Sequence, residues 1–165
     1  MLKKFIAAII IAVPALTFAQ GKFGIIKTQP IVEALPETKE AASQLEAASN
    51  KYQEEFKNFE DEMNKQVSEF QALGDDTPSM IKDRRMKDLQ DLNNKMNEFR
   101  SMAERDLQRQ QEQLFAPIQQ KVHDAIMAVG KEGNFTFIFE DMVPVYTGSD
   151  VIDITDAVKA KLDVK

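Results

Sequence analysis

Apolar residues in the middle of the chain recur every three or four positions, a spacing that places side chains on one face of a helix. Residues 37–73 contain no Gly or Pro and are otherwise rich in Glu, Lys, Gln, Asn and Ala. The spacings 3, 4 and 4 sum to 11 residues, which favours a straight or slightly right-handed helix pair. The apolar stripe of this predicted helix consists of Leu45, Ala48, Tyr52, Phe56, Phe59, Met63, Val67 and Phe70.

A second helical pattern begins after a break at residues 74–78 and extends to about residue 131. We expect Gly74 to end the first helix in the left-handed conformation, Thr77 to cap the second, and Pro78 to occupy its first position. So short a connection makes the helices antiparallel, with their stripes facing each other. The second stripe, interrupted at Gln110, consists of Leu89, Leu92, Met96, Phe99, Ala103, Leu107, Leu114, Ile118, Val122, Ala125 and Val129.

The two ends of the chain have a different pattern. Phe23–Lys27 is a short apolar run that predicts a strand, and Phe135–Phe139 alternates large apolar residues with others, as a half-buried strand does. Val143–Tyr146 is a candidate third strand, and Pro144, which lacks an N–H group, implies either a sheet edge or the start of a strand.

A short closing helix is expected to open at Asp153–Asp156. Thr155 would be its cap, and Val158 and Leu162 would form its buried face.

These patterns predict an α+β fold, mostly α, in which a helical hairpin is inserted into a small β-rich body. The body comprises residues 20–35 and 132–165, and the hairpin comprises residues 36–131, with its tip near 74–78. Two or three short strands and one small helix cannot bury a stable core alone. We therefore expect several chains to assemble and to complete one sheet or barrel.

Residues 1–19 have the pattern of a signal peptide. Lys3 and Lys4 precede an apolar run, and Ala19 fits a cleavage site, so the exported chain would begin at Gln20. The run is shorter than the roughly 20 apolar residues that a membrane-spanning helix needs. Because the chain has no Cys, a lipid anchor at the cleavage site, disulfides and thiolate chemistry are all excluded.

The charge balance limits the partners. The chain has 27 acidic residues against 21 Lys and Arg, a formal net charge of −6. Nucleic acids are therefore not expected partners, because neutralising phosphates requires clustered Lys and Arg. Repulsion from anionic lipid surfaces and the lack of another long apolar run argue against stable membrane insertion.

The sequence gives little support for an enzyme. His123 is the only histidine and flanks the second stripe without HExxH spacing, which favours a surface residue over a metal ligand or general base. Adjacent carboxylates such as Glu54 and Glu55 are typical of solvated helix faces. The chain has neither a Walker A sequence nor GxGxxG. We predict no catalytic, cofactor-binding or metal-binding residues.

Five residues of the second helix are candidates for binding partners. Met80 and Met102 lie off its stripe, where they would offer either an adaptable apolar surface or filling for the helix interface. Lys82, Arg84 and Arg85, together with Lys87, form a small basic patch near the tip, which would attract acidic segments or simply be a solvated face.

Pro117 lies inside the second helix and removes one of its hydrogen bonds. We expect a kink there. A hinge and a fixed adaptation of shape are both open interpretations.

The order of these elements resembles the Skp (OmpH-like) family of periplasmic chaperones. The resemblance covers the whole chain after the leader, and its motifs are Gly24–Gln29 leading to Leu35–Glu37, Pro117–Val122 before Ala125–Ile126, Asn134–Phe139, and Asp153–Thr155.

The resemblance implies a homotrimer with a small β-barrel body, in which Ile25, Phe135, Phe137 and Phe139 take part. Three hairpins would surround a cavity that holds unfolded outer-membrane proteins in the periplasm, without ATP or any cofactor. The best-known members are basic, whereas this chain is acidic. The alternative function is that of a structural or adaptor coiled coil of the cell envelope, which would bind one folded partner and ignore unfolded chains.

Overall fold

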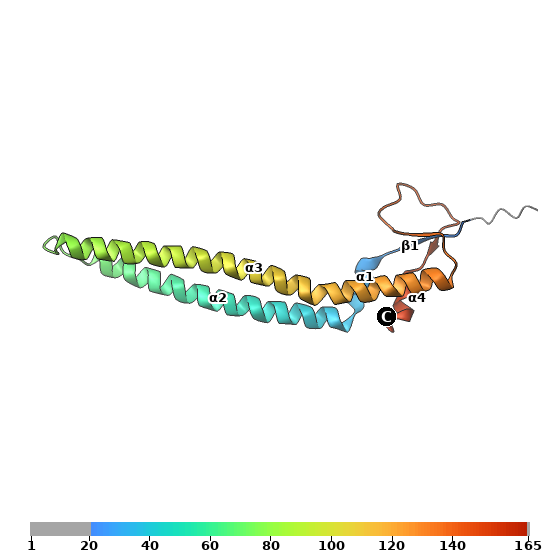
Figure 1. The fold of residues 1–165 in the computed structure, drawn as a ribbon, viewed down its shortest axis with the longest axis horizontal. Coiled ribbons are helices and arrows are strands. Elements are labelled where there is room, and N and C mark those ends of the chain that lie inside the picture. Colours follow the sequence, from blue (N-terminus) through green and yellow to red (C-terminus); the bar gives the residue numbers. More distant parts are fainter. Residues whose placement is uncertain (1–20, 165) are drawn as a thin grey trace, which may run out of the picture.

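The computed structural model describes residues 21–164 (Figure 1). The leader expected at residues 1–19 lies outside this range. The elements in chain order are β1 (Phe23–Ile26), α1 (Thr28–Ala34), α2 (Pro36–Gln71), α3 (Ser79–Glu132), β2 (Phe137–Glu140), β3 (Ile152–Asp153) and α4 (Thr155–Lys161).

Helices α2 and α3 form a long hairpin that extends from one end of a small body (Figure 1). They contain 36 and 54 residues, so their lengths are about 54 Å and 81 Å. Both begin and end within two residues of the expected positions. The periodic apolar pattern therefore predicted the hairpin correctly.

The turn at the tip differs from the expectation. None of the described glycines has a positive φ, so Gly74 does not end α2 in the left-handed conformation. Ala72 ends the helix with φ −77°, and the N–H of Thr77 donates to the Gly74 carbonyl at 3.1 Å. Pro78 precedes α3 as its N-cap, in an extended conformation, and Thr77 does not cap the helix. The connection is long enough to reverse the chain through ordinary turns.

The body contains a three-stranded parallel sheet in the order β2–β1–β3. Phe23 pairs with Phe137 and Ile25 with Phe139, while Ile25 also pairs with Asp153 on the other side. The expected pairing of the two chain ends is therefore present, with β1 as the central strand.

The third strand is not the one that we expected. Residues 143–146 form no strand but belong to an open loop, in which Val145 is fully exposed. The N–H of Val143 donates to the Glu140 carbonyl at 3.0 Å, which turns the chain away from the sheet. Ile152–Asp153 occupies the free edge of β1 instead, although Asp153 was expected to begin the closing helix. The next N–H, of Ile154, donates to the Ile25 carbonyl at 2.9 Å.

Helix α4 then starts at Thr155, but Thr155 is not its cap. The Asp153 carboxylate accepts the Thr155 N–H at 2.9 Å, and the Thr155 hydroxyl accepts the Lys27 N–H at 3.0 Å. Hydrogen bonding with Thr155 lowers the pKa of Asp153, and the nearby charge of Lys27 lowers it further. As expected, Val158 is buried and Leu162 packs against the core.

Helix α1 is an element that the sequence analysis missed. It carries the fully buried Ile31 and contacts α2, α3 and α4. Leu35, directly after it, is also fully buried. The core lies where the body meets the base of the hairpin and consists of Ile26, Ile31, Leu35, Ala41, Ile118, Val122, Ala125, Ile154 and Val158.

We predict that Ile31→Ala destabilises the protein by about 2–5 kcal/mol, because it leaves a cavity in a core that is already small. Met80→Ala, at a side chain that is 80% exposed, should change stability by no more than about 0.5 kcal/mol. Denaturant unfolding followed by circular dichroism measures both. Equal effects of the two substitutions would show that α1 does not dock as described.

Candidate functional site

The facing stripes of α2 and α3 pack against each other and leave few large apolar side chains free. Leu92 and Ala103 are buried in this interface, and most other stripe residues are half-buried. The outward surfaces of both helices are therefore mainly charged and amide side chains, with isolated apolar residues between them.

An aromatic cluster occupies the middle of the hairpin. The Phe99 ring lies 6.0 Å from the Tyr52 ring and 5.4 Å from the Phe59 ring, measured between centroids. The Arg100 guanidinium lies 4.8 Å from the Phe56 ring centroid, at a cation–π distance. These contacts fix which part of α2 faces which part of α3.

Asp106 adds a polar layer beside this cluster. Its carboxylate accepts a hydrogen bond from the Tyr52 hydroxyl at 2.6 Å, and it also accepts from Gln110 and pairs with Arg109. The side-chain amide of Gln110 donates to Asp106 in this layer, so a polar residue occupies that position of the predicted apolar stripe. The bond from Tyr52, followed by that from Gln110, lowers the pKa of Asp106. The same hydrogen bond raises the pKa of Tyr52, because the bond exists only while the Tyr52 hydroxyl keeps its proton.

The predicted binding residues do not form one site. Met80 is 80% exposed at the tip and Met102 is 55% exposed farther along α3, so neither fills the helix interface. Their separation of 22 positions corresponds to about 33 Å along the helix. Met102 lines a groove of about 580 Å³ together with Tyr52, Phe99, Ala103, Arg105, Asp106 and Arg109.

The basic patch is not a continuous positive surface. Arg85 lies 3.8 Å from the Glu69 carboxylate of α2, and Arg84 is exposed. Lys82 is half-buried, and Asp83 and Asp88 are interspersed with these cations along the helix. Residues 82–88 contain four cations and two acidic residues, and Glu69 adds a third negative charge, so the local charge is only slightly positive.

Helix α3 continues through Pro117, which lines a groove of about 310 Å³ between α2 and α3. Across this groove Lys121 pairs with Glu37, which lowers the pKa of the Glu37 carboxyl. This ion pair connects the two helices at the base of the hairpin, beside the proline.

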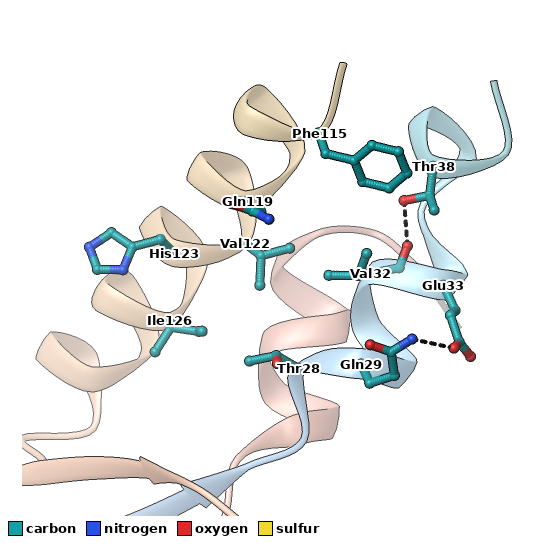
Figure 2. A pocket seen from close by; sticks show the side chains of 10 residues that line it. All are labelled: Thr28, Gln29, Val32, Glu33, Thr38, Phe115, Gln119, Val122, His123 and Ile126. Atoms are coloured by element: carbon teal, nitrogen blue, oxygen red, sulfur yellow. Dashed lines mark hydrogen bonds between the residues drawn. The ribbon is translucent and has the colours of Figure 1, made fainter. Parts of the chain in front are cut away.

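Sequence reasoning missed a third groove, which we call the α1–α3 groove. It has a volume of about 550 Å³ and is lined by Thr28, Gln29, Val32, Glu33, Thr38, Phe115, Gln119, Val122, His123 and Ile126. Figure 2 shows Phe115, Val122 and Ile126 of α3 facing Val32 of α1. One wall of this groove is α1. Because the sequence analysis did not predict α1, it could not predict the groove either.

The predicted body residues lie on different faces of the sheet. Phe135 is half-buried against the core, and the Lys22 amine lies 4.3 Å from its ring centroid. Phe137 and Phe139, by contrast, are 57% and 40% exposed, and Phe137 stacks on both Phe139 and Phe23. Ile138 points to the core instead. The side chains of β2 thus alternate between two faces as predicted, but Phe137 and Phe139 lie on the outer face. The half-buried Ile25 pairs with Phe139 and lies on this face too.

Residues 21–164 contain no group of three or more His, Cys, Asp or Glu side chains placed to hold a metal ion. Nor does any helix in this part of the chain combine the length and the apolar character needed to cross a membrane.

We predict that Tyr52→Phe lowers the melting temperature at neutral pH by removing the bond to Asp106. A carboxyl whose pKa is depressed on folding contributes stability above its unfolded pKa, here about 3.8, and loses it as pH falls through the folded value. The difference between wild type and Tyr52→Phe should therefore shrink below about pH 4. Thermal melts between pH 7 and pH 3 test this, and a constant difference would contradict it. Asp106→Asn should remove the same pH dependence.

Comparison with known proteins gives the family of this chain. A search of curated protein sequences gave no match. Among solved structures, the chain is similar to a Caulobacter crescentus CB15 protein described as a candidate outer membrane chaperone (OmpH-like). The TM-score is 0.72 over 88% of this chain and 85% of that one, and at 15% identity the likeness concerns the fold alone.

The family evidence comes from the sequence itself and confirms the resemblance found there. The family model described as outer membrane protein (OmpH-like) matches residues 22–162, from β1 to the end of α4. The chain therefore belongs to the OmpH-like family.

Proposed function

We propose that the protein is an ATP-independent holdase chaperone that binds unfolded outer-membrane proteins in the periplasm and prevents their aggregation. The observation that carries this proposal is the contrast between hairpin and body. The hairpin extends for about 54 Å, the length of α2, and has scattered exposed apolar residues, whereas the body presents a cluster of exposed aromatic rings. Membership of the OmpH-like family and the fold shared with the Caulobacter protein support it.

The body is the proposed site of trimerisation. Phe23, Phe137 and Phe139 stack on one face of a sheet that has only three strands, and β1 and β3 are short. An exposed aromatic cluster of this kind is typical of an interface between subunits. Three bodies joined through it would place three hairpins around a central space.

Clients would be held by many weak contacts in that space. No continuous apolar patch joins Met80, Ile81, Met86 and Met102 along α3, although each is at least two-fifths exposed. Separate weak contacts bind well only when an enclosure keeps their effective concentration high. Capture without a discrete pocket also suits clients of varied sequence, because flexible methionines adapt to different surfaces.

Export would precede this activity. The leader proposed at residues 1–19 would direct the chain to the periplasm, with Gln20 as the first residue after cleavage. The hinge at Pro117 remains a proposal as well. A change of angle there would widen or narrow the space between hairpins, and the groove beside Pro117 leaves room for it.

Phe137→Asp should dissociate the trimer without unfolding the chain. In the single chain this side chain is more than half exposed, but in the assembled body an aspartate would be an unpaired buried charge. Light scattering measures the mass and circular dichroism the helix content. Met102→Asp, an equal change on the hairpin, is the control and should stay trimeric. A trimeric Phe137→Asp variant would place the subunit interface elsewhere.

Removing the distal hairpin should abolish holding but not assembly. Tyr52 and Phe99 face each other across the hairpin, so residues 52–99 can be replaced by a short turn in register. The assay is aggregation of a denatured β-barrel membrane protein with each variant present. The point variants Met102→Ala and Arg85→Ala should change client affinity by no more than about 1 kcal/mol.

Two outcomes would contradict distributed holding. Complete loss of protection from a single substitution at the tip would indicate a discrete binding site. Failure of the wild-type protein to protect any unfolded client, with tight binding to one folded envelope protein, would favour the adaptor function.

A further inference from the structure

Two apolar features of the body are not covered by any other part of residues 21–164. The first is the loop between β2 and β3, in which Met142, Val143, Val145 and Tyr146 are all exposed. Val145 has the most exposed side chain among the large apolar residues of the described chain. Residues 142–149, which we call the apolar loop, include no charged side chain, although 29% of the chain is charged.

The second feature is the α1–α3 groove (Figure 2). Val32, Phe115, Val122 and Ile126 line it, and its only ionisable lining groups are Glu33 and His123. Gln29 already donates to the Glu33 carboxylate at 2.6 Å. Glu33 and His123 are both exposed, so an uncharged apolar segment could pack on the four apolar side chains while the Glu33 carboxylate keeps its contact with water, and burial of that apolar surface would be favourable.

The loop of the same chain does not fill this groove. None of residues 141–151 lines it. The Glu140 carboxylate accepts from the N–H and the hydroxyl of Thr28 at 2.9 and 3.1 Å, and the Asp141 N–H donates to the Ile26 carbonyl at 2.9 Å. These bonds fix the start of the loop on the sheet, and from there the loop projects into solvent (Figure 1).

We propose that the apolar loop of one copy docks into the α1–α3 groove of the next copy. Three identical chains around one axis must meet through two different surfaces of each chain. The loop and the groove are two such surfaces: the loop is apolar and uncharged, and the groove has an apolar wall with a mainly polar rim. Tyr146 would place its ring on the apolar wall, while the amides and hydroxyls at the rim offer partners for its hydroxyl group. This inference rests on the proposed trimer and specifies which of its surfaces meet.

Engineered disulfides can test this docking cleanly because the chain has no native cysteine. Full-length Val145→Cys protein is mixed with Gln119→Cys protein, exchanged through reversible unfolding, and oxidised. Gln119 lines the groove, whereas its neighbour Gln120 does not and is hydrogen-bonded to Asp124 instead. Gln120→Cys is therefore the matched control.

We expect the Val145–Gln119 mixture to form the cross-linked dimer at least about tenfold faster than the control mixture, because docking raises the local concentration of the two thiols. A disulfide requires Cα atoms about 4.4–6.8 Å apart, so random encounters of folded trimers cannot reproduce this selectivity. Tyr146→Cys with Gln29→Cys is a second pair, used if either variant of the first pair fails to fold.

The result that overturns the inference is cross-linking no faster than the control. If the protein then still has the mass of a trimer, the docking is wrong and the proposed assembly stands. If it has the mass of one chain, the proposed trimer fails as well. A Val145→Cys/Gln119→Cys double variant that closes a disulfide within one chain, with no link in the mixture, would instead assign the groove to the protein's own loop.

Discussion

The pairing of β1 with strands from the far end of the chain is the constraint on which the rest of the structure depends. A hairpin of two helices has one line of apolar contact and no globular core of its own. Strand β1 hydrogen-bonds to β2 on one side and to β3 on the other, so it joins segments more than 100 residues apart. This pairing closes the base of the hairpin and positions α1 and α4 over Ile118, Val122 and Ala125 of α3.

The distribution of apolar surface follows from this arrangement. In the hairpin, the stripes face each other and the remaining surface is charged, so a partner finds only isolated contacts such as Met80 and Met102. In the body, the short strands have more apolar residues than one sheet face can bury. The rings of Phe23, Phe137 and Phe139 therefore remain exposed together. Dispersed contacts suit the transient holding of many clients, and concentrated ones suit a permanent contact between subunits.

Polar contacts in the hairpin determine its register more than its strength. Apolar stripes tolerate sliding by one helical turn, because another apolar side chain then takes the same place. The bond from Tyr52 to Asp106 and the ion pair of Lys121 with Glu37 cannot be matched after such a shift. The ion pair is exposed, so water weakens it and its main effect is to specify one alignment, whereas the partly buried bond to Asp106 also contributes to stability.

The sequence by itself determined the hairpin, its ends to within two residues, the pairing of the two chain ends and the buried face of α4, because helix periodicity is a local property of the chain. Tertiary structure decided the features that depend on competition for partners. Ile152–Asp153 became the third strand because it reaches the free edge of β1, whereas the segment with Pro144 turns away. Thr155 does not cap α4 because its hydroxyl oxygen accepts the hydrogen bond from the Lys27 N–H instead. Alternation alone could not say which side of β2 is buried, since Ile138 and its phenylalanine neighbours are both apolar, and only the position of α3 and α4 decided it.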